Sequence, residues 1–160
     1  MLGVMSDDDR GPAGYASDID EARERLVAFA GRCTDDQWAC APLAGDPRPV
    51  GVVVDHVADS YEYLAGWMRR ILAGEAVTVT ADIVDGLNAE HAAAAAAVTQ
   101  AEAADHLRRS GAELSALVAG CSPAQMQAGD GRVERLAQVA IRHADNHRAE
   151  IEAVLAASAG

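Results

Sequence analysis

Aromatic residues are scarce in this sequence, at 4% of its 160 residues, and lysine is absent. A core with so few large rings must be built mainly from alanine, valine and leucine, whose small side chains let neighbouring elements approach closely. Hydrophobic residues still make up 50% of the chain, and its length is that of one ordinary domain. We therefore expect a single hydrophobic core.

Positive charge is also in short supply. The 13 basic residues face 25 acidic ones, and the formal net charge of -12 opposes binding to nucleic-acid phosphates or to an anionic membrane surface. No apolar run approaches the roughly 18 residues that span a bilayer. The first ten residues are acidic where a secretory signal would be basic and then apolar. We expect a cytoplasmic protein that binds neither nucleic acid nor membrane.

The cysteines are few and unpaired in pattern. Cys33, Cys40 and Cys121 form no C-x-x-C motif, and an odd number cannot all pair within one chain. No basic cluster lies beside them in the sequence to lower the pKa of a thiol. We expect reduced, buried, structural thiols.

What the sequence does contain is helical pattern. Alanine has the highest helix propensity, and few stretches combine β-branched residues with alternating polarity. Capping boxes at 34–37 and 99–102 and an N-cap with proline at 122–125 mark helix starts. Residues 77–80 resemble a strand but lack a partner segment, so we interpret 73–84 as an extended crossover. Long helices are predicted over residues 17–31, 50–72, 85–98, 99–118 and 132–157.

These elements predict an all-α fold, a four-helix bundle with short extra helical turns. Residues 1–16 are polar, acidic and glycine-containing, and we expect a flexible leader there. The bundle domain would then cover residues 17–160.

Two histidines in the last predicted helix suggest a metal site. His143 and His147 are four residues apart, which is about 40° around a helix of 3.6 residues per turn. Both imidazoles can therefore converge on one point and offer nitrogen ligands to a divalent metal. The spacing alone is weak evidence, because such pairs also occur by chance on exposed helix faces.

A third histidine strengthens this hypothesis. His56 lies among apolar residues in VGVVVDHVADSYEYL, and a buried imidazole there needs a partner. Metal binding together with His143 and His147 would supply one. A core histidine hydrogen-bonded to a backbone or carboxylate oxygen is the structural alternative.

The arrangement of these residues resembles the DinB superfamily, which includes mycothiol-dependent maleylpyruvate isomerases and related thiol S-transferases. The matching residues are His56 in VVDHVADSYEYL and His143 and His147 in RHADNHRAEI. The resemblance extends from about Leu26 to Leu155 and includes the TDDQW segment after the first helix.

The resemblance implies a four-helix bundle whose three histidines hold a divalent metal, zinc foremost, with nickel or iron as alternatives. Positions left open on the metal would admit water or substrate. In the thiol-using members a small thiol is thought to approach the metal, which would stabilise its thiolate. The family name implies no DNA function.

Several neighbours of the histidines are candidate catalytic residues. Glu150 shares the face of His143 and His147 and could bind a ligand histidine, act as a fourth ligand or move a proton, although pairing with an arginine is the alternative. Asp59 and Tyr63 follow His56 at i+3 and i+7 and could face the metal cavity. Solvation or ion pairing for Asp59, and a core position for Tyr63, are the structural alternatives.

Other polar and aromatic residues receive structural interpretations. Arg148 could recognise a carboxylate on a thiol cofactor, but a structural ion pair is the preferred interpretation. Trp38 and Trp67 are predicted to be packing anchors. His91 and His106 have no histidine partner at i±4, so we predict that neither binds metal.

Two functions compete at this point. The first is a metal-dependent S-transferase or isomerase that joins a small thiol to a small electrophile. The alanine-rich composition without lysine resembles that of high-GC actinobacterial proteins, in which mycothiol is the expected thiol. The second is a non-catalytic metal- or ligand-binding bundle in a stress or detoxification response. Family members often pair, so a homodimer is possible in either case.

Overall fold

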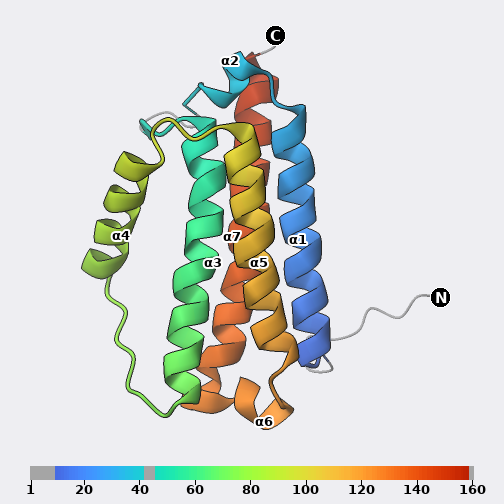
Figure 1. Cartoon of the computed structure of the whole chain (residues 1–160), viewed down its shortest axis with the longest axis vertical. Coiled ribbons are helices and arrows are strands. Elements are labelled where there is room, and N and C mark those ends of the chain that lie inside the picture. Colours follow the sequence, from blue (N-terminus) through green and yellow to red (C-terminus); the bar gives the residue numbers. More distant parts are fainter. Residues whose placement is uncertain (1–9, 42–45, 159–160) are drawn as a thin grey trace, which may run out of the picture.

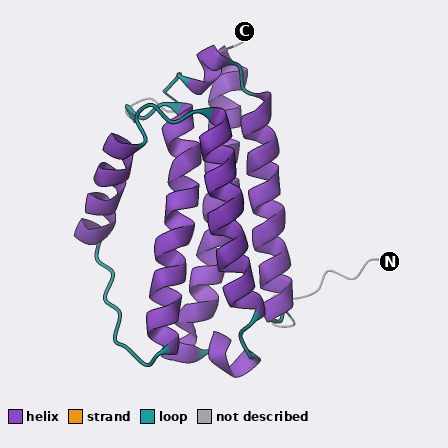
Figure 2. Cartoon of the chain, viewed as in Figure 1, coloured by secondary structure: helices purple, strands orange, loops and turns teal. Residues whose placement is uncertain are grey.

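The computed structural model describes residues 10–41 and 46–158, and within these ranges the chain is helical and contains no strand (Figure 2). The all-α prediction is confirmed. Seven helices are described: α1 Pro12–Arg32, α2 Asp35–Trp38, α3 Val50–Leu72, α4 Ala81–Ala94, α5 Gln100–Ala119, α6 Pro123–Met126 and α7 Ala128–Ser158.

Four of these helices form the bundle. α1, α3, α5 and α7 run side by side, while α4 lies outside them next to α3 (Figure 1). α3 packs against α5 and α7, and α1 packs against the same two helices. The core between them is rich in alanine, valine and leucine, with Tyr15, Phe29 and Tyr61 as its buried aromatic side chains in the described residues. Small side chains therefore bring α3 and α7 close together, and these two helices carry the predicted metal ligands.

The first helix begins earlier than the sequence predicted. α1 starts at Pro12 rather than Ser17, with Gly11 as its N-cap. Proline suits the first helical position because its missing N–H would have no intrahelical partner there. Tyr15 is 1% exposed, and its hydroxyl donates a hydrogen bond to Oε1 of Glu134 at 2.7 Å. Residues 12–16 thus belong to the bundle, and residues 1–9 of the predicted leader lie outside the described residues.

Helix α4 also differs from its prediction. It covers Ala81–Ala94 instead of 85–98, because the Thr80 hydroxyl accepts a hydrogen bond from the Ile83 backbone N–H and caps the helix. The chain leaves the helix before residue 98, since Thr99 must be extended to cap α5. The last three alanines of the run therefore form a turn.

The remaining boundaries follow the predicted signals. The capping boxes of α2 and α5 are formed, and so is a capping box at Ser122 before α6. α3 has the predicted bounds, with Gly74 in the left-handed region at φ 81° just after it. Residues 129–131 have positive φ, so regular helix in α7 begins near the predicted Arg132.

The predicted packing anchors contact the core. Trp38 and Trp67 are partly buried against it, and the Trp38 indole Nε1–H donates a hydrogen bond to the Val98 carbonyl at 2.9 Å. Cys33, Cys40 and Cys121 are free thiols, but each is only partly buried, not fully buried as predicted. Burial raises the pKa of the Cys33 and Cys121 thiols, which fits unreactive cysteines.

Candidate metal centre

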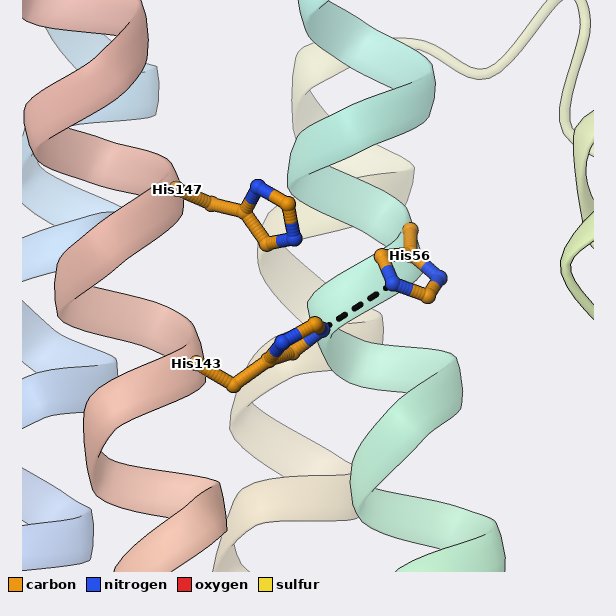
Figure 3. A group of neighbouring side chains, drawn as sticks. All are labelled: His56, His143 and His147. Atoms are coloured by element: carbon orange, nitrogen blue, oxygen red, sulfur yellow. Dashed lines mark hydrogen bonds between the residues drawn. The ribbon is translucent and has the colours of Figure 1, made fainter. Parts of the chain in front are cut away.

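Packing of α3 on α7 brings the three predicted ligands together. His56 comes from α3, and His143 and His147 come from successive turns of α7. Figure 3 shows the three imidazoles pointing toward one another across the space between the two helices. The convergence of His143 and His147 that their spacing predicted is therefore present, and the apolar stretch around His56 turns its ring toward them.

The distances are those of a compact cluster. Nε2 of His56 and Nε2 of His143 lie 3.0 Å apart, the contact drawn in Figure 3. Ring centroids are separated by 4.9 Å for His56–His143, 5.6 Å for His56–His147 and 4.5 Å for His143–His147. One ring nitrogen from each histidine lies within 4.8 Å of the other two. This group could hold a metal ion.

The environment keeps the imidazoles neutral. His56 is 4% exposed, and burial, with the neighbouring histidines and Arg48, lowers its pKa to about 3. Burial and the same kind of neighbours lower the pKa of His143 to about 4. Burial also lowers the pKa of His147, although Glu150 opposes the shift. A neutral imidazole keeps a nitrogen lone pair, so this donor set fits zinc, nickel or iron.

Glu150 contacts one of the three candidate ligands. Its Oε2 lies 3.2 Å from Nδ1 of His147, one turn away on α7. A carboxylate at this nitrogen holds the ring in the tautomer whose Nε2 is free for a metal. Of the roles predicted for Glu150, contact with a ligand histidine is the one this position favours.

Arg48 is a neighbour that sequence reasoning missed. It lies in the segment before α3, and its guanidinium makes three hydrogen bonds to the Asp46 carboxylate, the shortest from Nη2 to Oδ2 at 2.8 Å. Its positive charge lowers the pKa of all three histidines. No local pattern marks Arg48 in the sequence, because its approach to α7 depends on how the loop meets the bundle.

A cavity of about 200 Å³ lies beside the cluster and includes His56 and His143 in its wall. Tyr63 lines this cavity, which is the first of the two positions considered for it, and burial raises the pKa of its phenol to about 12. The hydroxyl therefore stays protonated near neutral pH and can donate a hydrogen bond. The other lining residues are Ser60, Leu64, Val84, Asn88 and Val139.

Asp59 lines a different cavity. This larger space, of about 710 Å³, lies among α3, α4 and α5, and Asp59 shares it with Asp55, His91 and His106. Burial raises the pKa of Asp59. Asp59 thus does not border the cavity beside His56, because a step of three residues along α3 does not bring it round to the side facing α7.

His91 and His106 share one buried partner. His91 Nε2 lies 2.9 Å from Oδ2 of Asp55, and His106 Nδ1 lies 2.9 Å from Oδ1 of the same carboxylate. Although burial would raise the pKa of Asp55, hydrogen bonds from the two histidines outweigh it and hold that pKa well below its usual range. Among the described residues neither histidine belongs to the convergent group of His56, His143 and His147. Sequence reasoning did not predict that Asp55 binds both histidines; we call these three residues the Asp55 cluster.

Arg148 makes ion pairs within its own helix. Its guanidinium nitrogens lie 2.9 Å from Glu152 Oε2 and 3.6 Å from Asp145 Oδ1. These contacts agree with the preferred interpretation of Arg148 as a structural residue.

The fold and the site together define a helical bundle with a three-histidine group that could hold a metal. A family model described as the DinB superfamily matches residues 18–151, so this chain belongs to the DinB superfamily, whose members bind metal. Searches among curated proteins and among solved structures each found no match. None of the helices in the described ranges is both long enough and apolar enough to cross a membrane.

Proposed function

We propose that this protein is a divalent-metal-dependent enzyme of thiol chemistry, an S-transferase or isomerase that acts on a small electrophile with a mycothiol-like thiol. The observation that carries the proposal is the convergence of three neutral histidines, one buried and two partly buried, in a DinB fold. Three protein nitrogens leave a tetrahedral metal one position for water or substrate. Zinc is the metal we expect, with nickel or iron as alternatives.

The residues around the site have distinct tasks in this proposal. A bound metal would supply a Lewis acid that stabilises a thiolate. Glu150 fixes the tautomer of His147 through Nδ1. Tyr63, protonated at neutral pH, donates a hydrogen bond to an oxygen of the electrophile in the small cavity. Arg148, engaged with Glu152, keeps a structural role.

Both candidate reactions balance without an external oxidant. In the transfer, the thiol proton goes to solvent, sulfur forms a bond to an electrophilic carbon, and the leaving group departs with the bonding electrons. In the isomerisation, sulfur adds to a conjugated double bond, the resulting single bond rotates, and elimination returns the thiol. The cytoplasm, where such thiols are reduced, is the location we propose, with a homodimer as the assembly.

The first test is the metal content of the purified protein, measured by elemental mass spectrometry in the parent and in His147→Ala. We expect about one equivalent of zinc, nickel or iron in the parent and little in the variant, because two histidines bind more weakly than three. Glu152→Ala, which removes a carboxylate from the same helix but no ligand, serves as the control and should retain the metal. Absence of metal from the parent, even after divalent ions are supplied, would overturn the proposal.

The second test measures thiol consumption with mycothiol, bacillithiol and glutathione against an alkyl halide, an epoxide and a conjugated cis-alkene acid. We expect turnover that requires both metal and thiol. If no combination of thiol and electrophile reacts, X-ray absorption of the metal-loaded protein distinguishes a catalytic metal site from a non-catalytic one. Four protein ligands without an exchangeable water would indicate a non-catalytic metal- or ligand-binding bundle instead.

A further inference from the structure

The side of α4 that meets α3 carries polar atoms without partners. Asn88 and His91 are three residues apart and so lie on one face of α4. Asn88 Oδ1 and His91 Nδ1 are buried and have no hydrogen-bond partner among the described residues, and the same is true of His56 Nδ1 on α3. Unpaired buried polar atoms are rare because each costs free energy, so three of them in one region need an explanation.

His56 needs an acceptor at its second ring nitrogen. Its Nε2 lies 3.0 Å from Nε2 of His143, so Nε2 is the ring nitrogen that would bind a metal shared with His143. The proton of a neutral imidazole that binds metal through Nε2 must then sit on Nδ1, and metal-binding histidines almost always donate that N–H to an oxygen. Asn88 Oδ1 can only accept. Donor and acceptor belong to residues that line the same cavity of about 200 Å³.

His91 attaches α4 to α3 and so keeps Asn88 at the cavity beside His56. It is the one buried residue of α4, a helix that is described in full, and its Nε2 lies 2.9 Å from the Asp55 carboxylate. Asp55 directly precedes His56 on α3, and the His56 and His91 rings are 5.7 Å apart. The rest of α4 is partly or fully exposed, and Ile83 is 45% exposed. The hydrogen bond between His91 and Asp55, rather than a broad apolar contact, therefore holds α4 beside the cavity.

We propose that Asn88 is a positioning residue for the metal centre: its side-chain oxygen accepts a hydrogen bond from Nδ1–H of His56, directly or through one water in the cavity. This inference rests on the proposed function, since it assumes that the histidines bind metal. Because coupling between two sites is reciprocal, the bond links metal affinity to the docking of α4. Losing the acceptor weakens metal binding, and removing the metal loosens α4.

The affinity experiment compares zinc binding, by competition with a chromophoric chelator, in the parent and three variants. Asn88→Leu keeps the size of the side chain and removes the acceptor, so zinc should bind about 10- to 100-fold more weakly. Asn88→Asp keeps an acceptor and should stay within a few-fold of the parent. Glu90→Leu, at an exposed position of α4, should not change the affinity.

Hydrogen exchange supplies a readout that does not depend on activity. Zinc should slow amide exchange across Ala81–Ala94 in the parent and in Asn88→Asp, and much less in Asn88→Leu. Long-range nitrogen–proton NMR should show a protected Nδ1–H on His56 in the zinc-loaded parent. In the Asn88→Leu protein that proton should exchange with solvent faster.

The outcomes separate this inference from the proposed function. A parent that binds no zinc, nickel or iron when these ions are supplied overturns both. A parent that binds zinc with an Asn88→Leu variant of equal affinity overturns only the role of Asn88. If Asn88→Asp loses as much affinity as Asn88→Leu, the acceptor role is wrong and Asn88 acts through packing alone.

Discussion

At the scale of single residues, burial keeps the clustered histidines neutral, which is the form that can bind a metal. An exposed imidazole has a pKa near 6.5 and is partly protonated at neutral pH. The bundle removes His56 and His143 from water and lowers their pKa values to about 3 and about 4, so both keep their lone pairs. Protons therefore compete weakly with a metal at these nitrogens in neutral solution.

Glu150 provides a residue-scale prediction. Glu150→Ala removes the carboxylate at His147 Nδ1 and frees the ring to change tautomer, so zinc affinity should fall about tenfold, the lower end expected for such a contact because Glu150 is exposed. Chelator competition measures the effect. Glu152→Ala, whose carboxylate pairs with Arg148 instead of a histidine, should bind zinc like the parent. Equal losses in both variants would show that α7 surface charge, not the contact with His147, matters.

At the scale of elements, α3 connects the separate parts of the site. Successive residues are about 100° apart around a helix, so Asp55 and His56 leave α3 in different directions. Asp55 holds His91 of α4 and His106 of α5, while His56 meets His143 of α7. The position of α3 along and around its axis therefore determines both clusters at once.

The start of α3 provides an element-scale prediction. Gly51 lies against the Trp38 indole, and a Cβ there would overlap the ring at Nε1 unless one of the two residues moved. Gly51→Ala must displace Trp38 and weaken its hydrogen bond to the Val98 carbonyl. We expect a loss of about 1–3 kcal/mol in the free energy of unfolding, measured by urea denaturation.

A glycine later in the same helix provides the matched control. A Cβ at Gly66 would meet no atom within 4 Å. Gly66→Ala should therefore stabilise the protein by about 0.5–1 kcal/mol, because alanine loses less backbone entropy in a helix. A destabilised Gly66→Ala, or an unaffected Gly51→Ala, would contradict the assigned contact with Trp38.

At the scale of the whole molecule, the cluster of Asp55, His91 and His106 connects α3, α4 and α5 and makes the stability of the fold depend on pH. The hydrogen bond to Asp55, aided by Glu62 at 3.0 Å from Nε2, raises the pKa of His106. A group whose pKa is higher in the folded state stabilises the fold fully below its unfolded pKa of about 6.5. That contribution is lost as pH rises through the folded pKa.

The loss of the His106 contribution as pH rises can be tested with His106→Gln, which keeps a polar side chain but cannot become charged. In chelator-containing buffer, the parent should exceed the variant in unfolding free energy by about 1 kcal/mol more at pH 6 than at pH 9. Taking the difference between the two proteins cancels the opposite effect of His56 and His143, whose lowered pKa values destabilise the fold at acid pH. A difference that does not vary with pH would remove His106 from this role.

Local signals predicted most of the secondary structure and part of the site. The bounds of α3 and the capping boxes depend on interactions within a few residues, and these predictions are confirmed. The predicted convergence of His143 and His147 follows from their four-residue spacing and is also present. Two helix starts differ from the prediction. Polar and glycine-containing residues around Gly11–Pro12 and β-branched residues before Thr80 favour irregular chain, yet Pro12 and the Thr80 cap each begin a helix there.

What the sequence determined by itself is therefore the all-α class, most helix boundaries and a histidine pair able to share one face, because these follow from propensity, capping and a fixed helical period. Only the tertiary structure decided that His56 completes the cluster, that Arg48 approaches it, and that Asp59 does not. It also decided that Asn88 and His56 line the same cavity. Contacts between helices depend on how each helix is rotated and shifted against its neighbours, and packing of the whole core sets those two quantities.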